Sequence, residues 1–539
     1  MLDTKISSDI NQGRYATLEE INEETEVVDY VNGKGTASGV TVYTDGKTAR
    51  VHDDDGFNMV VGGTGSKKTR DVIAPYIVNN AIAGNSMIIS DVKGDLYKLT
   101  SRLLRKNEYR VVVLNFNDPD RGDAYNPITP IYRDYKKNGK SDRANRELNS
   151  FSETIFASMI SDKEPYWHTT ASMYFTGLEL SLFDNFEETD ATIVNALNLH
   201  IQGNKRFAGS SYMKEFYSDI ENAEAWKMML PSVNVPNETR SCIHSTFVAA
   251  LNKLVGQNKS LIKMLSHSTF EVQEIIDKKV AVFLIANEES LSVHAGLITA
   301  LIQQWYNMLN NIADQTNGVL KRKVAFVLDE MGNLPALKDF EVTISLARAR
   351  NISFTIAIQS FAQLELRYGK EVARTIIGNT TNWIYLFSPD PELLKYVSEL
   401  TGEVTDENGK TRNLLSVNQL RHLKKRTEEG LTECLMILGR LNPMVCYLRD
   451  ISEYYGIEPI DSLDIPLRED VEVPDIDFCS IVEAKKRKKM EKKIDDAEQE
   501  RQKQWLEMNK KKDSIKRKDP FQLSAIMNNV IGELIGGRV

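Results

Sequence analysis

A near-complete phosphate-binding loop lies at residues 62–69. In the pattern G-x-x-x-x-G-K-[ST], backbone N–H groups surround nucleotide phosphates, the Lys reaches the β/γ oxygens and the hydroxyl binds Mg²⁺. Gly62, Lys68 and Thr69 match this pattern, whereas Lys67 stands where the last Gly is expected. If position 67 requires a positive φ, this residue costs about 1–3 kcal/mol and weakens nucleotide binding roughly tenfold to a hundredfold. We therefore expect Lys67→Gly to tighten ATP binding and Lys68→Ala to abolish it.

The flanking sequence predicts the strand and helix that such a loop requires. The segment 57–61 is typical of a buried strand, and 68–81 of the helix that follows it. A loop between them lies at a helix N-terminus, where anions bind. A glycine-rich turn before an ordinary helix is the alternative interpretation. The residues predicted to contact ATP are Gly62, Gly63, Thr64, Gly65, Ser66, Lys67, Lys68 and Thr69.

A second motif begins with the apolar segment 324–328, which ends in Asp329 and Glu330. Asp329 is predicted to bind Mg²⁺ together with Thr69, and Glu330 to polarise the attacking water. Gln359, at the end of the next predicted strand, is placed to sense the γ-phosphate. Any strand can end in two carboxylates, but this strand and the loop together predict a hydrolase that uses ATP and Mg²⁺.

Two arginines, Arg348 and Arg350, end the predicted helix between those strands. In a ring of subunits, one of them would reach the neighbour's nucleotide as an arginine finger. The alternative is that both are ordinary basic residues at a helix C-terminus, where the helix dipole favours positive charge.

Apolar strands alternate with helical periodicity around these motifs, which predicts an α/β fold with a doubly wound parallel sheet. Between about 141 and 269 the periodicity is helical almost throughout, which indicates an inserted all-α domain. A short run of alternating residues at 39–43 predicts a small β lead-in. The predicted strands are 57–61, 86–90, 110–116, 280–286, 324–328, 353–358 and 382–387. The predicted domains are the lead-in at 1–55, the nucleotide-binding domain at 56–140 and 270–460, the all-α insertion at 141–269 and a charged tail at 461–539.

Composition restricts the class of protein. The 539 residues are 41% hydrophobic and carry a formal charge of −9, which indicates a globular chain and argues against a uniformly basic nucleic-acid wrapper. Four cysteines without a C-x-x-C pair, and histidines without ligand spacing, predict reduced thiols, a cytoplasmic location and no structural metal. The longest apolar runs are too short to span a membrane. The basic runs after residue 483 predict a solvated helix or disordered tail, or else an arm that binds nucleic acid or an acidic partner, and 521–527 a docking helix.

The motifs, taken in order, resemble those of type IV secretion system coupling proteins of the TraG/TraD class, the RecA-like motor ATPases of conjugation. The matching segments are Gly13–Thr17, the loop at 62–69, Ser90–Tyr97, Tyr125–Pro127, Asp329–Pro335, Gln359–Ser360, Ile377–Asn379 and Glu433–Ile437. The resemblance implies a RecA-like P-loop domain that carries the all-α insertion. It also implies a nucleotide site of Lys68, Thr69, Asp329, Glu330 and Gln359, with Arg348 as the finger.

The resemblance further implies a hexameric ring on the cytoplasmic side of the membrane, peripherally associated with it. Such a ring would receive single-stranded DNA led by a relaxase, or effector proteins, and deliver them to inner-membrane channel components. The membrane helices usual at the family's N-terminus are missing from this sequence, so either a separate protein is the anchor or the chain is a shortened form. Two alternatives stay open: a cargo-recruitment platform with weak or no ATP hydrolysis, and a chromosome-partitioning DNA pump of the FtsK type.

Overall fold

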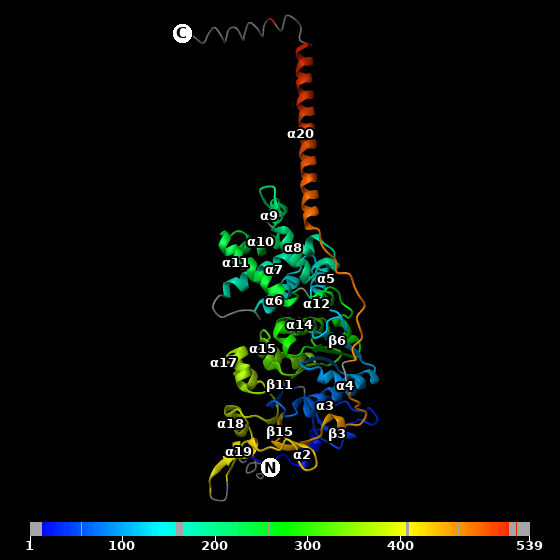
Figure 1. Cartoon of the computed structure of the whole chain (residues 1–539), viewed down its shortest axis with the longest axis vertical. Helices are drawn as coiled ribbons and strands as arrows, with labels where there is room; N and C mark the ends of the chain where they lie inside the picture. The colour runs from blue at the N-terminus through cyan, green and yellow to red at the C-terminus, as the bar shows by residue number, and fades with distance from the viewer. Residues whose placement is uncertain are drawn as a thin grey trace, which may run out of the picture. The chain divides into compact units, whose positions relative to one another are not determined.

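A nine-stranded mixed β-sheet organises most of the chain. The structure is a computed structural model that describes residues 13–54, 56–157, 165–220, 223–256, 258–405, 409–461, 464–516 and 524 (Figure 1). The strand order is β16-β15-β12-β4-β11-β10-β5-β9-β6. The bounds are β4 (Asn58–Gly62), β5 (Ser86–Asp91), β6 (Arg110–Asn115), β9 (Val280–Ile285), β10 (Val324–Leu328), β11 (Ile352–Ile358), β12 (Asn382–Phe387), β15 (Thr432–Leu438) and β16 (Met444–Leu448).

The seven strands from β12 to β6 are parallel to one another, and they are the seven strands that the sequence predicts. Strands β15 and β16 extend the sheet as an antiparallel hairpin next to β12, which the sequence interpretation did not assign as strands. Strands β4, β5, β9, β10 and β11 are buried throughout. Such burial on both faces explains why they read as continuous apolar runs.

Helices cover both faces of this sheet. Helices α3 (Ala74–Ala83) and α4 (Asp95–Lys106) pack with alternate strand residues into one core cluster. On the other face, Tyr306 of α14 (Glu288–Gln315) contacts the rings of Phe326 and Phe354, and Phe340 of α15 (Phe340–Ala347) contacts Phe354. Figure 1 shows α3 and α4 in blue on one side of the strands and α14 and α15 in green on the other. The fold is the predicted α/β fold of the RecA-like P-loop class.

The N-terminal segment forms the small β structure that the sequence predicts. It contains α2 (Leu18–Glu23) and an antiparallel sheet of β1 (Glu26–Asp29), β2 (Val40–Thr44) and β3 (Thr48–His52) in the order β1-β3-β2. Its apolar side chains join the core cluster that contains α3. This sheet therefore packs on the same face of the large sheet as the helix that follows the phosphate-binding loop.

The segment between β6 and β9 is predominantly helical, as predicted. It also contains the short turn η2 (Glu188–Asp190) and a two-stranded sheet of β7 (Arg206–Phe207) and β8 (Ser210–Ser211). Helices α7 and α10 pack closely: a side chain at Gly177 of α7 would meet Met229 Cγ at 2.5 Å and the Ala225 carbonyl oxygen at 2.8 Å. The helices are α5 (Thr129–Lys137), α6 (Asp142–Ala157), α7 (Pro165–Asn185), α8 (Ile193–Gly203), α9 (Tyr212–Tyr217), α10 (Glu224–Val233), α11 (Asn237–Leu254), α12 (Lys259–Met264) and α13 (Val272–Asp277).

The remaining elements follow β10. They are the short turns η3 (Met331–Asn333) and η4 (Arg348–Arg350), α16 (Phe361–Tyr368), α17 (Lys370–Gly378), α18 (Pro391–Leu400), β13 (Glu403–Thr405), β14 (Thr411–Asn413), α19 (Val417–Arg421) and η5 (Ile451–Glu453). In the part of the chain that the structure describes, no helix is both long and apolar enough to cross a bilayer.

A second compact unit joins residues 199–221 to the chain from residue 476 onward, in so far as these are described. Its main element is α20 (Phe478–Lys516), a helix of 39 residues in the predicted charged tail. The Lys485 ammonium lies 4.2 Å from the centre of the Phe216 ring, and Lys489 pairs with Asp219 at 2.6 Å. Part of the basic run therefore makes contacts within the chain. The predicted docking helix at 521–527 lies outside the described residues, apart from Ser524.

Candidate nucleotide site

The phosphate-binding loop connects β4 to a helical turn, η1 (Thr69–Ile73), that continues into α3. Gly62 is required by close packing, since a side chain there would collide with the Ser66 hydroxyl and lie 3.0 Å from Lys68 Cγ. Gly65 has a φ of +73°, which suits glycine. Lys67 has a φ of +70°. The condition for backbone strain at position 67 is therefore met, and a non-glycine residue there costs about 1–3 kcal/mol.

The Lys68 side chain is buried beneath the loop. Its ammonium donates to the carbonyl oxygens of Gly62 and, at 3.3 Å, Gly63. Burial lowers the pKa of Lys68, and the carboxylates of Asp329 and Glu330 oppose this shift. The ammonium thus lies at the base of the loop, where it is able to meet a phosphate.

Asp329 and Thr69 meet although 260 residues separate them. The Thr69 hydroxyl donates to Asp329 Oδ2 at 3.1 Å. The sheet order explains this contact, because β10, β11 and β4 are neighbours and the carboxyl ends of parallel strands share one edge. Burial, and next the charge of Glu330, raise the pKa of Asp329 to about 6.

The donor set at this edge fits Mg²⁺. Asp329 Oδ1 is buried and has no hydrogen-bond partner among the described residues, while Oδ2 faces the Thr69 hydroxyl. Mg²⁺ prefers such oxygen ligands and is usually bound by one or two carboxylates together with substrate phosphates. The structure therefore brings together the two residues that the sequence predicted for the metal.

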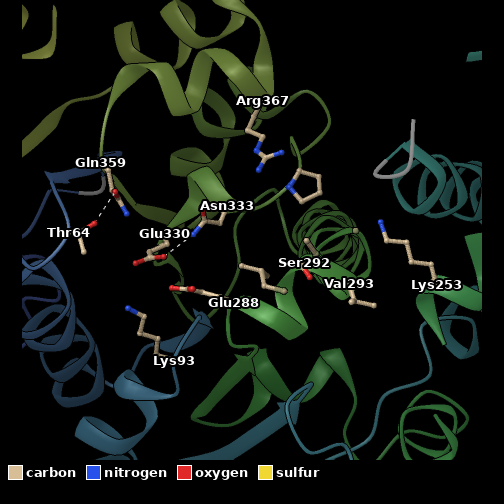
Figure 2. Close-up of a pocket in the computed structure, with 14 residues that line it drawn as sticks. Thr64, Lys93, Lys253, Glu288, Ser292, Val293, Glu330, Asn333, Gln359 and Arg367 are labelled. Atoms are coloured by element: carbon tan, nitrogen blue, oxygen red, sulfur yellow. Dashed lines mark hydrogen bonds between the residues drawn. The ribbon is translucent and has the colours of Figure 1, made fainter. Parts of the chain in front are cut away.

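Glu330 lines two adjoining cavities, and Gln359 lines the larger of them. One cavity, of about 320 Å³, is lined by the loop from Thr64 to Arg70 and by Asp329 and Glu330. The other, of about 480 Å³, is lined by Thr64, Glu330 and Gln359 and by residues of α14. Figure 2 shows the larger cavity, with Lys93, Lys253, Glu288 and Arg367 among the side chains that line it.

Each of these two residues has a defined partner. Gln359 Oε1 accepts a hydrogen bond from the Thr64 hydroxyl at 3.3 Å, and Glu330 Oε2 accepts one from Asn333 Nδ2 at 2.8 Å (Figure 2). Glu330 has a φ of +54°, a conformation that costs a non-glycine residue about 1–3 kcal/mol and that is common at active sites. The geometry holds Glu330 beside the phosphate-binding cavity while Asn333 restrains its carboxylate.

Arg348 is not brought to the nucleotide site of its own chain. It lies in η4, at the start of β11, whereas Gln359 follows the other end of that strand. Arg348 lines neither of the two cavities. Arg350 is bound to α14, with its guanidinium donating to Asp314 at 2.5 Å and to the Asn310 carbonyl at 3.2 Å. A finger role for Arg348 therefore requires a neighbouring subunit.

Six further residues line the phosphate-binding cavity that the sequence prediction of the site did not include: Arg70, Asp91, Val92, Lys93, Asp95 and Lys425. Asp91 ends β5, accepts a hydrogen bond from the Tyr97 N–H at 2.8 Å, and has a pKa that burial raises to about 7. The Lys425 ammonium lies 3.7 Å from where a side chain at Gly65 would begin. Asp91 and Lys93 belong to a matched family motif that could have identified them, whereas Lys425 had no signal beyond its basic neighbours.

Comparison with known proteins identifies a family. The family described as "Type IV secretory system Conjugative DNA transfer" matches residues 5–429. Protein VirD4 of Rhizobium rhizogenes is 25% identical over 356 residues, which cover 65% of this chain and 49% of that protein. Conjugal transfer protein TraG of Rhizobium radiobacter is 23% identical over 358 residues, which cover 66% of this chain and 53% of that protein. The chain spans about half the length of these curated relatives.

Solved structures of the coupling protein TrwB share the fold. TrwBΔN70 in complex with sulphate is 15% identical, with a TM-score of 0.58, over 81% of this chain and 95% of that one. TrwB in complex with the ATP analogue ADPNP is 14% identical, with a TM-score of 0.58, over 85% of this chain and 97% of that one. At this level of identity the likeness concerns the fold alone.

Proposed function

Because the chain belongs to the type IV secretory system conjugative DNA transfer family, we propose that it is an ATP-driven coupling protein. In this role it recruits relaxase-bound single-stranded DNA, or an effector protein, and delivers it to the inner-membrane secretion channel. The observation that carries the proposal is the contact between Thr69 and Asp329, which joins the two nucleotide motifs in one cavity. TrwB has been solved with ADPNP, and with ADP and Mg²⁺, which supports the choice of ligands.

The roles of the residues follow from their positions. Thr69 and Asp329 would hold Mg²⁺, which neutralises phosphate charge when bound. The loop N–H groups and the Lys68 ammonium would bind the β- and γ-phosphates. Glu330 would accept the proton of the attacking water, and Gln359 would report the γ-phosphate to the loop through its hydrogen bond from Thr64.

A ring completes this site. Arg348 lies at the sheet edge opposite the phosphate-binding loop, so a finger role needs a second copy of the chain. We propose a hexamer on the cytoplasmic side of the membrane, held there by its channel partners or by a separate membrane anchor protein. Single-stranded DNA would pass through its channel.

The test is ATP turnover of the purified chain with single-stranded DNA, with duplex DNA and without DNA, across protein concentration. A motor that works as a ring should show turnover that rises with single-stranded DNA and with concentration, and Glu330→Gln should abolish it. Turnover that changes neither with single-stranded DNA nor with protein concentration would refute the assembly of a ring. No turnover at all, with cargo still bound, would refute the motor.

One observation favours the alternative role of a cargo-recruitment platform with little hydrolysis. Helix α20 exposes Met490, Ile494, Trp505, Leu506 and Met508. Exposed apolar side chains on a charged helix are typical of a surface that binds another helix. In this alternative, deletion of residues 490–539 abolishes cargo binding while the parent chain shows no DNA-stimulated turnover.

A further inference from the structure

The side chain of Lys67 is directed into a charged cluster beside the loop. Its ammonium lies 3.6 Å from Asp71 Oδ2 and 3.9 Å from Asp450 Oδ2, and the side chain is 16% exposed. Asp71 belongs to the turn that starts the helix after the loop, and Asp450 follows strand β16. Lys67 therefore makes a contact between the loop and a distant part of the chain.

The two carboxylates of this cluster differ in their other partners. Asp450 receives two hydrogen bonds from the Arg70 guanidinium, at 2.7 and 2.6 Å. Asp71 is fully buried and receives one from the Thr432 hydroxyl at 2.6 Å, while its Oδ1 has no partner among the described residues. Asp71 thus depends on Lys67 for its positive charge more than Asp450 does.

The cluster links the loop to the β15–β16 hairpin. Thr432 is the first residue of β15, and Asp450 lies two residues after the end of β16. Removing a cation from a buried carboxylate leaves an uncompensated charge, which is strongly destabilising. The ion pair between Lys67 and Asp71 thereby offsets part of the free-energy cost of the positive φ at Lys67.

We propose that Lys67 is a positioning residue: its ammonium neutralises Asp71, bridges it to Asp450, and so fixes the phosphate-binding loop to the β15–β16 hairpin in the conformation that binds ATP. This inference rests on the proposed function for the identity of the ligand. The sequence predicted that Lys67→Gly tightens ATP binding, and this inference predicts the opposite. The change relieves the backbone strain at position 67 but leaves Asp71 without its cation. Glycine at position 67 should help only when Asp71 is also made neutral.

The experiment is a double-mutant cycle of Lys67→Gly and Asp71→Asn, with the ATP dissociation constant and the thermal unfolding midpoint measured for all four proteins. Asparagine at position 71 keeps an acceptor for the Thr432 hydroxyl and removes the charge. We expect Lys67→Gly alone to weaken Mg²⁺-ATP binding about tenfold and to lower the midpoint. The double variant should bind ATP at least as tightly as the parent and regain the midpoint.

Lys67→Met distinguishes the effect of the lost charge from the effect of relieved backbone strain. Methionine keeps a side chain at the positive φ and removes only the ammonium. It should weaken ATP binding at least as much as Lys67→Gly, and Asp71→Asn should again restore part of the loss. The matched control is Lys395 and Glu399, an exposed pair with the same i,i+4 spacing on α18, at 3.9 Å. The variants Lys395→Gly and Glu399→Gln, alone or combined, should have the same ATP dissociation constant as the parent.

If the parent chain binds ATP, either of two results would overturn the inference. One is Lys67→Gly binding ATP as tightly as the parent or more tightly, with Asp71 intact. The other is a double-mutant cycle in which the substitutions change the thermal unfolding midpoint but not the ATP dissociation constant of the folded proteins. A contact that only stabilises the fold would give that result. If no protein of the set binds ATP, the proposed function fails on its own. The midpoints then decide whether the contact exists, and the positioning role is refuted.

Discussion

The hydroxyl of Thr69 offers a sharp test of the metal site. It donates to Asp329 Oδ2 at 3.1 Å, and no other hydroxyl of the described loop residues bonds to that carboxylate. Thr69→Val keeps the branched shape of the side chain and removes only this hydroxyl. The change should therefore act on Mg²⁺ binding and leave the loop backbone in place.

The expected magnitude follows from the chemistry of the contact. A hydrogen bond to a charged group contributes about 1.5–3 kcal/mol, which corresponds to a factor of roughly 10 to 150 in affinity. At pH 8 Asp329 is ionised, since its pKa is raised only to about 6 by burial and by Glu330. We expect Thr69→Val to weaken ATP binding about 10- to 100-fold in Mg²⁺, and less than about threefold in EDTA.

The assay is an equilibrium titration with a fluorescent ATP analogue at pH 8, with and without Mg²⁺. Thr69→Ser, which keeps the hydroxyl, should behave as the parent does. Thr64→Val is the matched control, because the Thr64 hydroxyl bonds to Gln359 rather than to Asp329. If Thr69→Val retained the parent's full gain of affinity from Mg²⁺, the assignment of Thr69 and Asp329 to the metal would be refuted.

Three further predictions concern single residues. Glu330→Gln should retain ATP binding and lose turnover, as measured by phosphate release; a variant with residual turnover above a tenth of the parent's would contradict the role of Glu330. Asn333→Ala removes the hydrogen bond that restrains the Glu330 carboxylate, worth about 1.5–3 kcal/mol, and should raise DNA-independent turnover about tenfold or more; unchanged or lower turnover would contradict the restraint. Among the described residues, neither carboxyl oxygen of the fully buried Glu179 has a hydrogen-bond partner. Burial raises the pKa of Glu179 to about 8, so its protonated form contributes stability that is fully present below the unfolded pKa near 4.5 and is lost as the pH rises to 8. The unfolding midpoint of the parent should therefore fall relative to that of Glu179→Gln between pH 5 and 8, and parallel curves would contradict the shift.

The parallel strands were predictable from the sequence because most of them lie in the buried centre of the sheet. Strands β4, β5, β9, β10 and β11 are covered on both faces, so each reads as an uninterrupted apolar run. Strand β16 lies at the sheet edge with β15 next to it, and both include exposed or partly exposed positions, such as Glu433 and Tyr447, that break this pattern. Their segment was noticed only as a family motif, and its role as a hairpin emerged from the pairing with β12.

The candidate site was predictable to the extent that its residues belong to local motifs. The loop pattern placed Gly62, Lys68 and Thr69, and it also predicted the conformational problem at Lys67, whose φ is indeed positive. The partners of Lys67 were not predictable in the same way. Asp71 is one helical turn away, but Asp450 comes from the far end of the sheet domain, and only folding brings it to the loop.

If both motifs form one ATP site in one chain, a calorimetric titration with Mg²⁺-ATP should detect that site. We expect saturable binding of one nucleotide per chain. Lys68→Ala should abolish this binding, and Asp329→Asn should weaken it only when Mg²⁺ is present. Absence of saturable binding by the parent chain, or binding that survives Lys68→Ala unchanged, would show that the two motifs do not form an ATP site.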